Sequence, residues 1–183
     1  IDIYNAGVTE GGNLVFEVSL SALSELDVNF NYETLAGTSL FSAVSPADYG
    51  ALVVNGALIP AETDSVTVMV TTVPDGLFEE SEDLRVQISG VVNAAAGSLT
   101  IATGIIVDDD AAAKPTLSIY DTTVAESGVA SFVVSLSQES GVFAKFDLNT
   151  YTQTASGSDF DTTLQACHIL PAGSLTMSVS VPT

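Results

Sequence analysis

The residues with the clearest chemical potential are five carboxylates crowded into one short turn, VPDGLFEESED, at positions 73–83. At a separation of about 5 Å and an effective dielectric constant near 20, each close pair would repel by roughly 3 kcal/mol. Arg85 is the only basic residue nearby in the sequence, and one guanidinium cannot balance so many anions. We therefore favour a bound hard cation over a merely solvated acidic loop.

Calcium is the cation that best suits such a turn. It accepts about six to eight oxygen ligands and tolerates irregular geometry, whereas magnesium demands a tighter octahedron and usually keeps water. Zinc prefers histidine and cysteine, and residues 1–110 contain neither. The expected cofactor is therefore Ca²⁺.

The net charge of the chain excludes several classes of partner. The 183 residues include 23 acidic and 3 basic side chains, which gives a formal charge of −20. So negative a chain is not expected to bind nucleic acid or an anionic membrane. The hydrophobic content of 46% is high enough for folded cores. No apolar run is long enough for membrane insertion.

The acidic residues are concentrated in the first part of the chain. Residues 1–110 contain 17 of them against Arg85 alone, a charge of −16, and the remainder carries −4. The first part is thus expected to hold the metal. No signal peptide opens the sequence, and we expect the chain to be a piece of a longer protein.

The sequence offers no convincing catalytic group. A single cysteine, Cys167, excludes an internal disulfide framework. Its neighbour His168 lies in the same predicted strand, so the two side chains should point to opposite faces and cannot act as a nucleophile and base pair. We therefore expect that the protein is not an enzyme.

Alternation of apolar and polar residues predicts an all-β fold. In LVFEVSLS, for example, Leu14, Phe16, Val18 and Leu20 share one face. The same pattern recurs in DVNFNYETL from residue 27, SVTVMVTTV from 65, DLRVQIS from 83 and SLTIATGIIV from 98. No window has a helical stripe, and short strands between turn residues indicate immunoglobulin-like antiparallel β-sandwiches.

An internal repeat shows that two sandwiches are present in tandem. IDIYNAGVTEGGNLVFEVSLS at 1–21 is matched by LSIYDTTVAESGVASFVVSLS at 117–137, an offset of 116. Further along, LIPAETDSVTVMV is matched by ILPAGSLTMSVSV at an offset of 111, because the intervening loops differ in length. We expect a first domain at 1–110, a short linker at 111–115 and a partial second domain at 116–183.

The second copy lacks counterparts of the acidic turn and of the last two strands of the first copy. An incomplete sandwich would expose an apolar face and unpaired strand edges. Either the protein continues beyond this sequence, which we favour, or another molecule supplies the strands by β-augmentation.

The order of motifs in residues 1–110 resembles a Calx-beta domain, the module found in sodium/calcium exchangers and many surface proteins. The resemblance rests on Glu10 in VTEGG, then DY, LIPAE, PDGLFEESEDLRVQIS and a terminal DDD. It implies a seven-stranded β-sandwich with calcium bound by loops at one end. One acidic ligand of some members is missing, since this chain has Pro74, Asp75 and Gly76 there.

The resemblance also implies a set of calcium ligands. By position in the motifs these are Glu10, Asp48, Asp75, Glu79, Glu82, Asp108, Asp109 and Asp110. Glu80 and Asp83 alternate with them and are expected to face outward. In the second copy only Glu126 and Asp159 match, so that copy should not hold a complete site by itself.

The expected function is that of a calcium-binding tandem repeat in a longer extracellular or cell-surface protein. Calcium would stiffen the joint between neighbouring domains for a structural or adhesive role, and the partners would be calcium ions with neighbouring repeats or copies of the same protein. One alternative is a filament or assembly subunit completed by strand donation from a neighbour. Another is a calcium-sensing regulatory module of a transporter.

Overall fold

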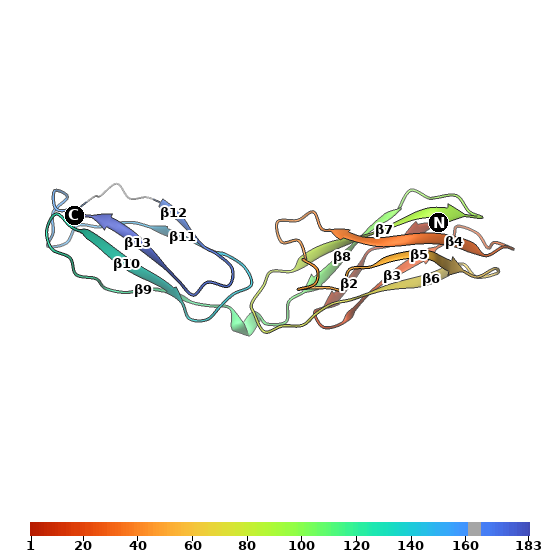
Figure 1. Ribbon diagram of the computed structural model, residues 1–183, viewed down its shortest axis with the longest axis horizontal. Helices are drawn as coiled ribbons and strands as arrows, with labels where there is room; N and C mark the ends of the chain where they lie inside the picture. The colour runs from red at the N-terminus through yellow and green to blue at the C-terminus, as the bar shows by residue number, and fades with distance from the viewer. Residues whose placement is uncertain (161–165) are drawn as a thin grey trace. The chain divides into compact units, whose positions relative to one another are not determined.

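The computed structural model describes residues 1–160 and 166–183 of the chain, and these form two compact units (Figure 1). Unit 1 comprises Ile1–Asp75 and Glu80–Asp109, and unit 2 comprises Gly76–Glu79 and Asp110–Thr183. A short 3₁₀ helix, η1 (Ala111–Ala113), lies in the segment predicted to be a linker. Within the described residues, no helix is long and apolar enough to cross a membrane.

Unit 1 is a sandwich of two β-sheets (Figure 1). One sheet has three strands in the order β1-β3-β6, and the other has five in the order β2-β8-β7-β4-β5. The strands are β1 (Asp2–Ile3), β2 (Ala6–Thr9), β3 (Asn13–Ser19), β4 (Val28–Ala36), β5 (Val53–Ile59), β6 (Ser65–Thr71), β7 (Glu82–Val92) and β8 (Ile101–Val107).

The core of unit 1 is made by the predicted alternating residues. Leu14, Phe16 and Val18 on β3 are fully buried, as are Leu84 and Val86 on β7. Burial of an aliphatic or phenyl side chain contributes about 1.5–3 kcal/mol, so these positions fix which face of each strand turns inward. The predicted all-β, immunoglobulin-like sandwich is confirmed.

One strand pairing departs from the expected antiparallel pattern. β2 runs parallel to β8, with Thr9 opposite Val107. The remaining strand pairs of unit 1 are antiparallel. The strand order was not predictable from alternation alone, because period two sets the inward face of a strand and leaves its neighbours undetermined. Parallel pairing places the ends of β2 and β8 at the same edge of the sheet.

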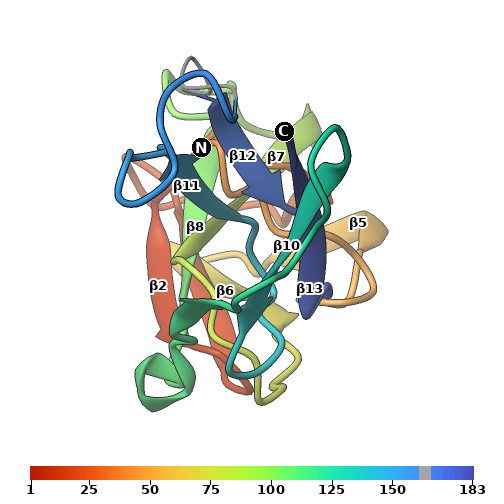
Figure 2. The same cartoon turned by 90° about the vertical axis from the view of Figure 1, so that its left-hand side faces the viewer.

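Unit 2 repeats part of this architecture (Figure 2). One sheet has the order β13-β10-β9 and the other contains β11 and β12. The strands are β9 (Leu117–Ile119), β10 (Val129–Leu136), β11 (Ala144–Leu148), β12 (Ala166–Leu170) and β13 (Thr176–Pro182). Among the described residues, unit 2 has no counterparts of β7 and β8.

The two adjacent residues Cys167 and His168 lie on β12 with opposite orientations. Cys167 is exposed, whereas His168 is half-buried. The imidazole ring of His168 stacks on the ring of Phe146, with the ring centroids 5.4 Å apart. This geometry follows from the pleat of the strand, because successive side chains point to opposite faces.

Candidate metal centre

The ends of four strands meet at one end of unit 1, and an acidic residue opens or follows each of these strands within four positions. Glu10 follows β2, and Asp108 follows β8, its parallel neighbour. Asp75 lies just beyond β6, whose last residue pairs with the first residue of β3. Glu82 opens β7 opposite Ile106, near the end of β8. Strand topology therefore gathers carboxylates that are far apart in the sequence.

Six of the eight predicted ligands form two compact groups. Glu10, Asp75 and Asp110 make up the first group, and Asp48, Glu79 and Glu82 make up the second; Asp110 and Glu79 adjoin unit 1 in the sequence, directly after Asp109 and directly before Glu80. Within each group, one carboxylate oxygen from every residue lies within 4.8 Å of the others. Asp75 is exposed, and the other five are partly buried. Each group offers oxygen atoms only, which is the donor set that calcium prefers.

The electrostatics of the first group is unfavourable without a cation. The pKa of Glu10 is raised from its ordinary 4.5 to about 7, mainly by burial and also by the negative charges of Asp75, Asp108 and Asp109. A long hydrogen bond of 3.5 Å from the Asp75 backbone N–H to Glu10 Oε1 acts in the opposite direction. Asp108 and Asp109, which belong to neither group, therefore still act on Glu10 through their charge.

A tight turn positions Glu10. The Gly12 N–H donates to the Thr9 carbonyl at 3.2 Å, and the Gly12 carbonyl accepts from both the backbone N–H and the hydroxyl of Thr72, at 2.9 and 3.0 Å. A Cβ atom on Gly12 would lie 2.5 Å from Val8 Cγ2, which leaves no room for a side chain. Gly11 has a φ of +73° and lies against Pro74, so glycine is required there as well.

Thr72 is a positioning residue that motif matching did not single out. It is 2% exposed and links the β2–β3 turn to the segment that carries Asp75. Its inward orientation follows the alternation of Val66, Val68 and Val70, so periodicity alone could have placed it in the interior.

Backbone hydrogen bonds to Val44 in the same loop and to Val73 in the acidic turn hold Asp48 in place. The Val44 N–H donates to its carboxylate at 2.5 Å, and its own backbone N–H donates to the Val44 carbonyl at 2.8 Å. The Asp48 carbonyl also accepts from the Val73 N–H at 2.9 Å, which joins this loop to the acidic turn. The carboxylate thus has a defined place close to Glu79 and Glu82.

The prediction that Asp83 faces outward is wrong, whereas Glu80 is exposed as expected. Asp83 is 6% exposed because the loop after β4 covers this face of β7. Its carboxylate accepts hydrogen bonds from the Thr38 N–H at 2.7 Å, the Ser39 N–H at 3.1 Å and the Ser39 hydroxyl at 2.5 Å. Burial by itself would raise the pKa of Asp83, but these hydrogen bonds outweigh it and hold the pKa below 3.8.

Arg85, the one basic residue near the turn in sequence, is directed to the backbone. Its Nε–H donates to the Ala36 carbonyl at 2.9 Å, on the neighbouring strand β4. This hydrogen bond links β7 to β4, so the Arg85 guanidinium contributes to the pairing of these two strands.

In unit 2, the matching residue Asp159 has a local role. Its carboxylate accepts hydrogen bonds from the N–H and hydroxyl of Ser156, at 2.7 and 3.0 Å, and these bonds lower its pKa. Glu126 is exposed. Within the described part of the chain, neither Glu126 nor Asp159 belongs to a cluster of side chains that could bind a metal.

The chain shares its fold with solved structures of Calx domains. The chain is similar to the crystal structure of the calcium binding domain CBD12 of CALX1.1, with a TM-score of 0.54 and 19% identity over 98% of this chain and 74% of that one. CBD12 from CALX1.2 gives a TM-score of 0.52 with 19% identity over 100% and 74%. The apo-form Calx CBD1 domain gives 0.51 with 22% identity over 60% and 100%.

At these identities the likeness establishes the fold alone. No protein-family model and no curated protein matches the chain. The roles of the individual carboxylates therefore rest on the geometry described above.

Proposed function

We propose that the acidic end of unit 1 binds calcium through the two carboxylate groups. The observation that carries this proposal is that carboxylates from separate strand ends lie within 4.8 Å of one another in each group. Side chains of like charge do not gather in this way without a cost, and a divalent cation removes it. One solved structure of similar fold, CBD12 of CALX1.1, is itself described as a calcium binding domain, which supports the same ion.

The residues suit two ions with incomplete protein coordination. Three carboxylates supply at most six oxygens if each is bidentate, and calcium takes about six to eight ligands, so water or backbone carbonyls would complete each shell. Asp108 and Asp109 are placed to strengthen the negative potential around the first group or to contribute directly, since both act on Glu10.

The proposed role is a binding and structural one in a longer extracellular or cell-surface protein. The run Asp108–Asp110 immediately precedes the linker at 111–115, so neutralising these carboxylates would stiffen the chain as it leaves unit 1. At a dissociation constant of about 10⁻⁴ to 10⁻³ M, a hundredfold excess of calcium adds about 2.7 kcal/mol of stability per site. That is a large share of the stability of a typical domain.

Calorimetric titration and thermal unfolding of the full chain test the proposal. We expect calcium to raise the unfolding temperature relative to chelator, with two ions bound to the wild type and one to each of the variants Glu10→Gln and Glu82→Gln. Glu25→Gln is the matched control, since Glu25 is exposed and lies outside both groups. An unfolding temperature that is the same in calcium and in chelator would refute the proposal.

Affinity separates this role from the alternative of a calcium-sensing module in a transporter. Signalling sites bind calcium with dissociation constants of about 10⁻⁷ to 10⁻⁵ M, and extracellular modules bind it with dissociation constants of about 10⁻⁴ to 10⁻³ M. A micromolar dissociation constant in the same titration would favour the sensor over the structural role.

A further inference from the structure

The segment 37–48, which we call the Asp48 loop, follows β4 and passes over the first residues of β7. Its residue Ser42 forms a parallel β-bridge with Asp83. At its far end, a carboxylate oxygen of Asp48 lies within 4.8 Å of one of Glu82. The loop therefore meets β7 at two neighbouring residues, first at Asp83 and then at Glu82.

Asp83 binds the first half of the Asp48 loop through its side chain and through its backbone. Its carboxylate accepts two hydrogen bonds from Ser39 and one from the Thr38 N–H. Its backbone N–H donates to the Phe41 carbonyl at 3.2 Å, and its carbonyl accepts from the Ala43 N–H at 2.9 Å. A single residue of β7 thus holds this half of the loop at several points.

The contact between the Asp48 loop and Asp83 is tight, and it leads directly to the Asp48 carboxylate. A Cβ atom on Gly37 would lie 2.2 Å from the Asp83 carbonyl oxygen and 2.3 Å from its Oδ1, so no side chain fits at position 37. Ala43 is 3% exposed, which fixes the other end of this half in the core. The next residue, Val44, donates its N–H to the Asp48 carboxylate at 2.5 Å.

We propose that Asp83 is a positioning residue for the second carboxylate group, because it holds the loop that places Asp48 beside Glu82 before calcium binds. This inference rests on the proposed function. Glu82 and Asp83 are successive residues of a strand and point to opposite faces, so Asp83 acts through the loop and not as a ligand. The loop is ordered when the domain folds, and calcium binding does not have to supply the free energy of that ordering.

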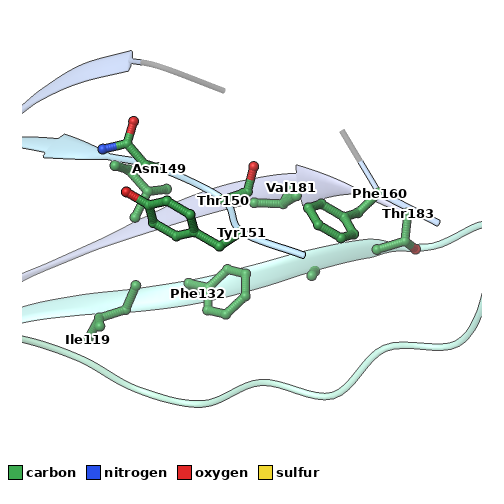
Figure 3. A pocket seen from close by; sticks show the side chains of 10 residues that line it. Ile119, Phe132, Asn149, Thr150, Tyr151, Phe160, Val181 and Thr183 are labelled. Atoms are coloured by element: carbon green, nitrogen blue, oxygen red, sulfur yellow. The ribbon is translucent and has the colours of Figure 1, made fainter. Parts of the chain in front are cut away.

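Unit 2 shows a different environment at the corresponding place. The segment 149–151 follows β11 and lines an apolar pocket of about 350 Å³ (Figure 3). Figure 3 shows Tyr151 on the opposite side of this pocket from Phe132. No lining side chain is charged. Among the described residues, the loop that is held by a buried carboxylate is therefore the one that carries a member of a carboxylate group.

A test of the proposal displaces the loop without changing any charge. Gly37→Ala introduces the clash with Asp83, whereas the matched control Gly50→Ala adds a Cβ at an ordinary 3.9 Å from the Thr71 carbonyl. Each change is made in the full chain in two backgrounds. The Glu10→Gln background keeps the second carboxylate group intact, and the Glu82→Gln background keeps the first.

Calorimetric titration with calcium should show a selective loss of affinity. We expect Gly37→Ala to weaken binding about 10–100-fold in the Glu10→Gln background and less than about twofold in the Glu82→Gln background. Gly50→Ala should change neither. Ser39→Ala removes one hydrogen bond to Asp83 and is the milder variant should Gly37→Ala fail to fold; it should weaken only the second group, by about threefold to tenfold.

Hydrogen exchange in chelator tests the position of the loop independently of calcium. In Gly37→Ala, the amides of Ala43 and Val44 should exchange at least about tenfold faster, while the core amide of Val86 keeps its rate. Unchanged exchange of the Ala43 and Val44 amides would overturn the proposal, because the loop would then keep its place without Asp83.

The titrations also distinguish failure of this inference from failure of the proposed function. An equal loss of affinity in the two backgrounds, or no loss in the Glu10→Gln background, would overturn the positioning role of Asp83 while the wild type still binds two calcium ions. A wild type that binds no calcium would overturn the proposed function and the inference together.

Discussion

Replacing Asp83 by alanine should destabilise unit 1 more than removal of any exposed carboxylate of the acidic turn. The side chain is 6% exposed and accepts three hydrogen bonds, two from backbone N–H groups and one from a hydroxyl. A hydrogen bond to a charged group contributes about 1.5–3 kcal/mol. Thr38 and Ser39 are exposed enough for water to replace part of this, so we expect a loss of about 2–3 kcal/mol in all.

The measurement is urea unfolding of the full chain in chelator at pH 7, followed through the exchange of core amides such as that of Val86, which report on unit 1. Because the pKa of Asp83 is lowered in the folded state, its contribution is fully present above the ordinary value of 3.8 and is lost as the pH falls through the lowered one. Glu80→Ala is the control, since it removes the same charge from an exposed neighbour and should change stability by less than about 0.5 kcal/mol. If Asp83→Ala costs no more than Glu80→Ala, the buried hydrogen bonds do not stabilise this end of the sandwich.

Three further outcomes follow from the same geometry. The raised pKa of Glu10 means that calcium-free unit 1 loses stability as the pH rises from 4.5 to about 7. In urea unfolding, Glu10→Gln should therefore be more stable than wild type at pH 8 by about 1 kcal/mol and equally stable near pH 5. The expected gain is about a third of the free energy that corresponds to the full pKa shift, because the carboxylate is partly solvated. Lower stability of the variant at pH 8 would contradict the raised pKa of Glu10. Calcium affinity should fall as the pH drops below 7, because Glu10 must lose its proton to bind the ion. We expect a decrease of up to about tenfold per pH unit, and titration calorimetry at pH 6 and pH 8 measures it. Gly12→Ala should destabilise unit 1 by about 1–3 kcal/mol in urea through the clash with Val8, whereas Gly76→Ala, with nothing within 4 Å of the added Cβ, should be neutral.

The strand segments were predictable because their alternation is strong. SVTVMVT corresponds to β6, and LVFEVS lies within β3, since Val, Phe and Leu at every second position leave a strand only one face to bury. The short strand β2 was not predicted, because its sequence AGVT is too brief for a pattern.

The composition of the candidate site was predictable in part. Motif order brought Glu10 together with Asp75 and the aspartates after β8, and the structure places them at one end of unit 1. The division into two groups of three carboxylates was not predictable, because it depends on how the loops that carry Asp48 and Glu79 are folded. Alternation also failed at Asp83, since the covering loop after β4 leaves no mark on the pattern of β7.

The parallel pairing of β2 with β8 has a consequence for the rates at which unit 1 folds and unfolds. It joins the first and last parts of the unit, and closing so long a segment of chain is slow and comes late. The calcium ion proposed for this end of the unit would be held only after that closure, so it would not accelerate the earlier steps. Its stabilisation should appear almost wholly as slower unfolding, so that bound calcium would slow the opening of the domain.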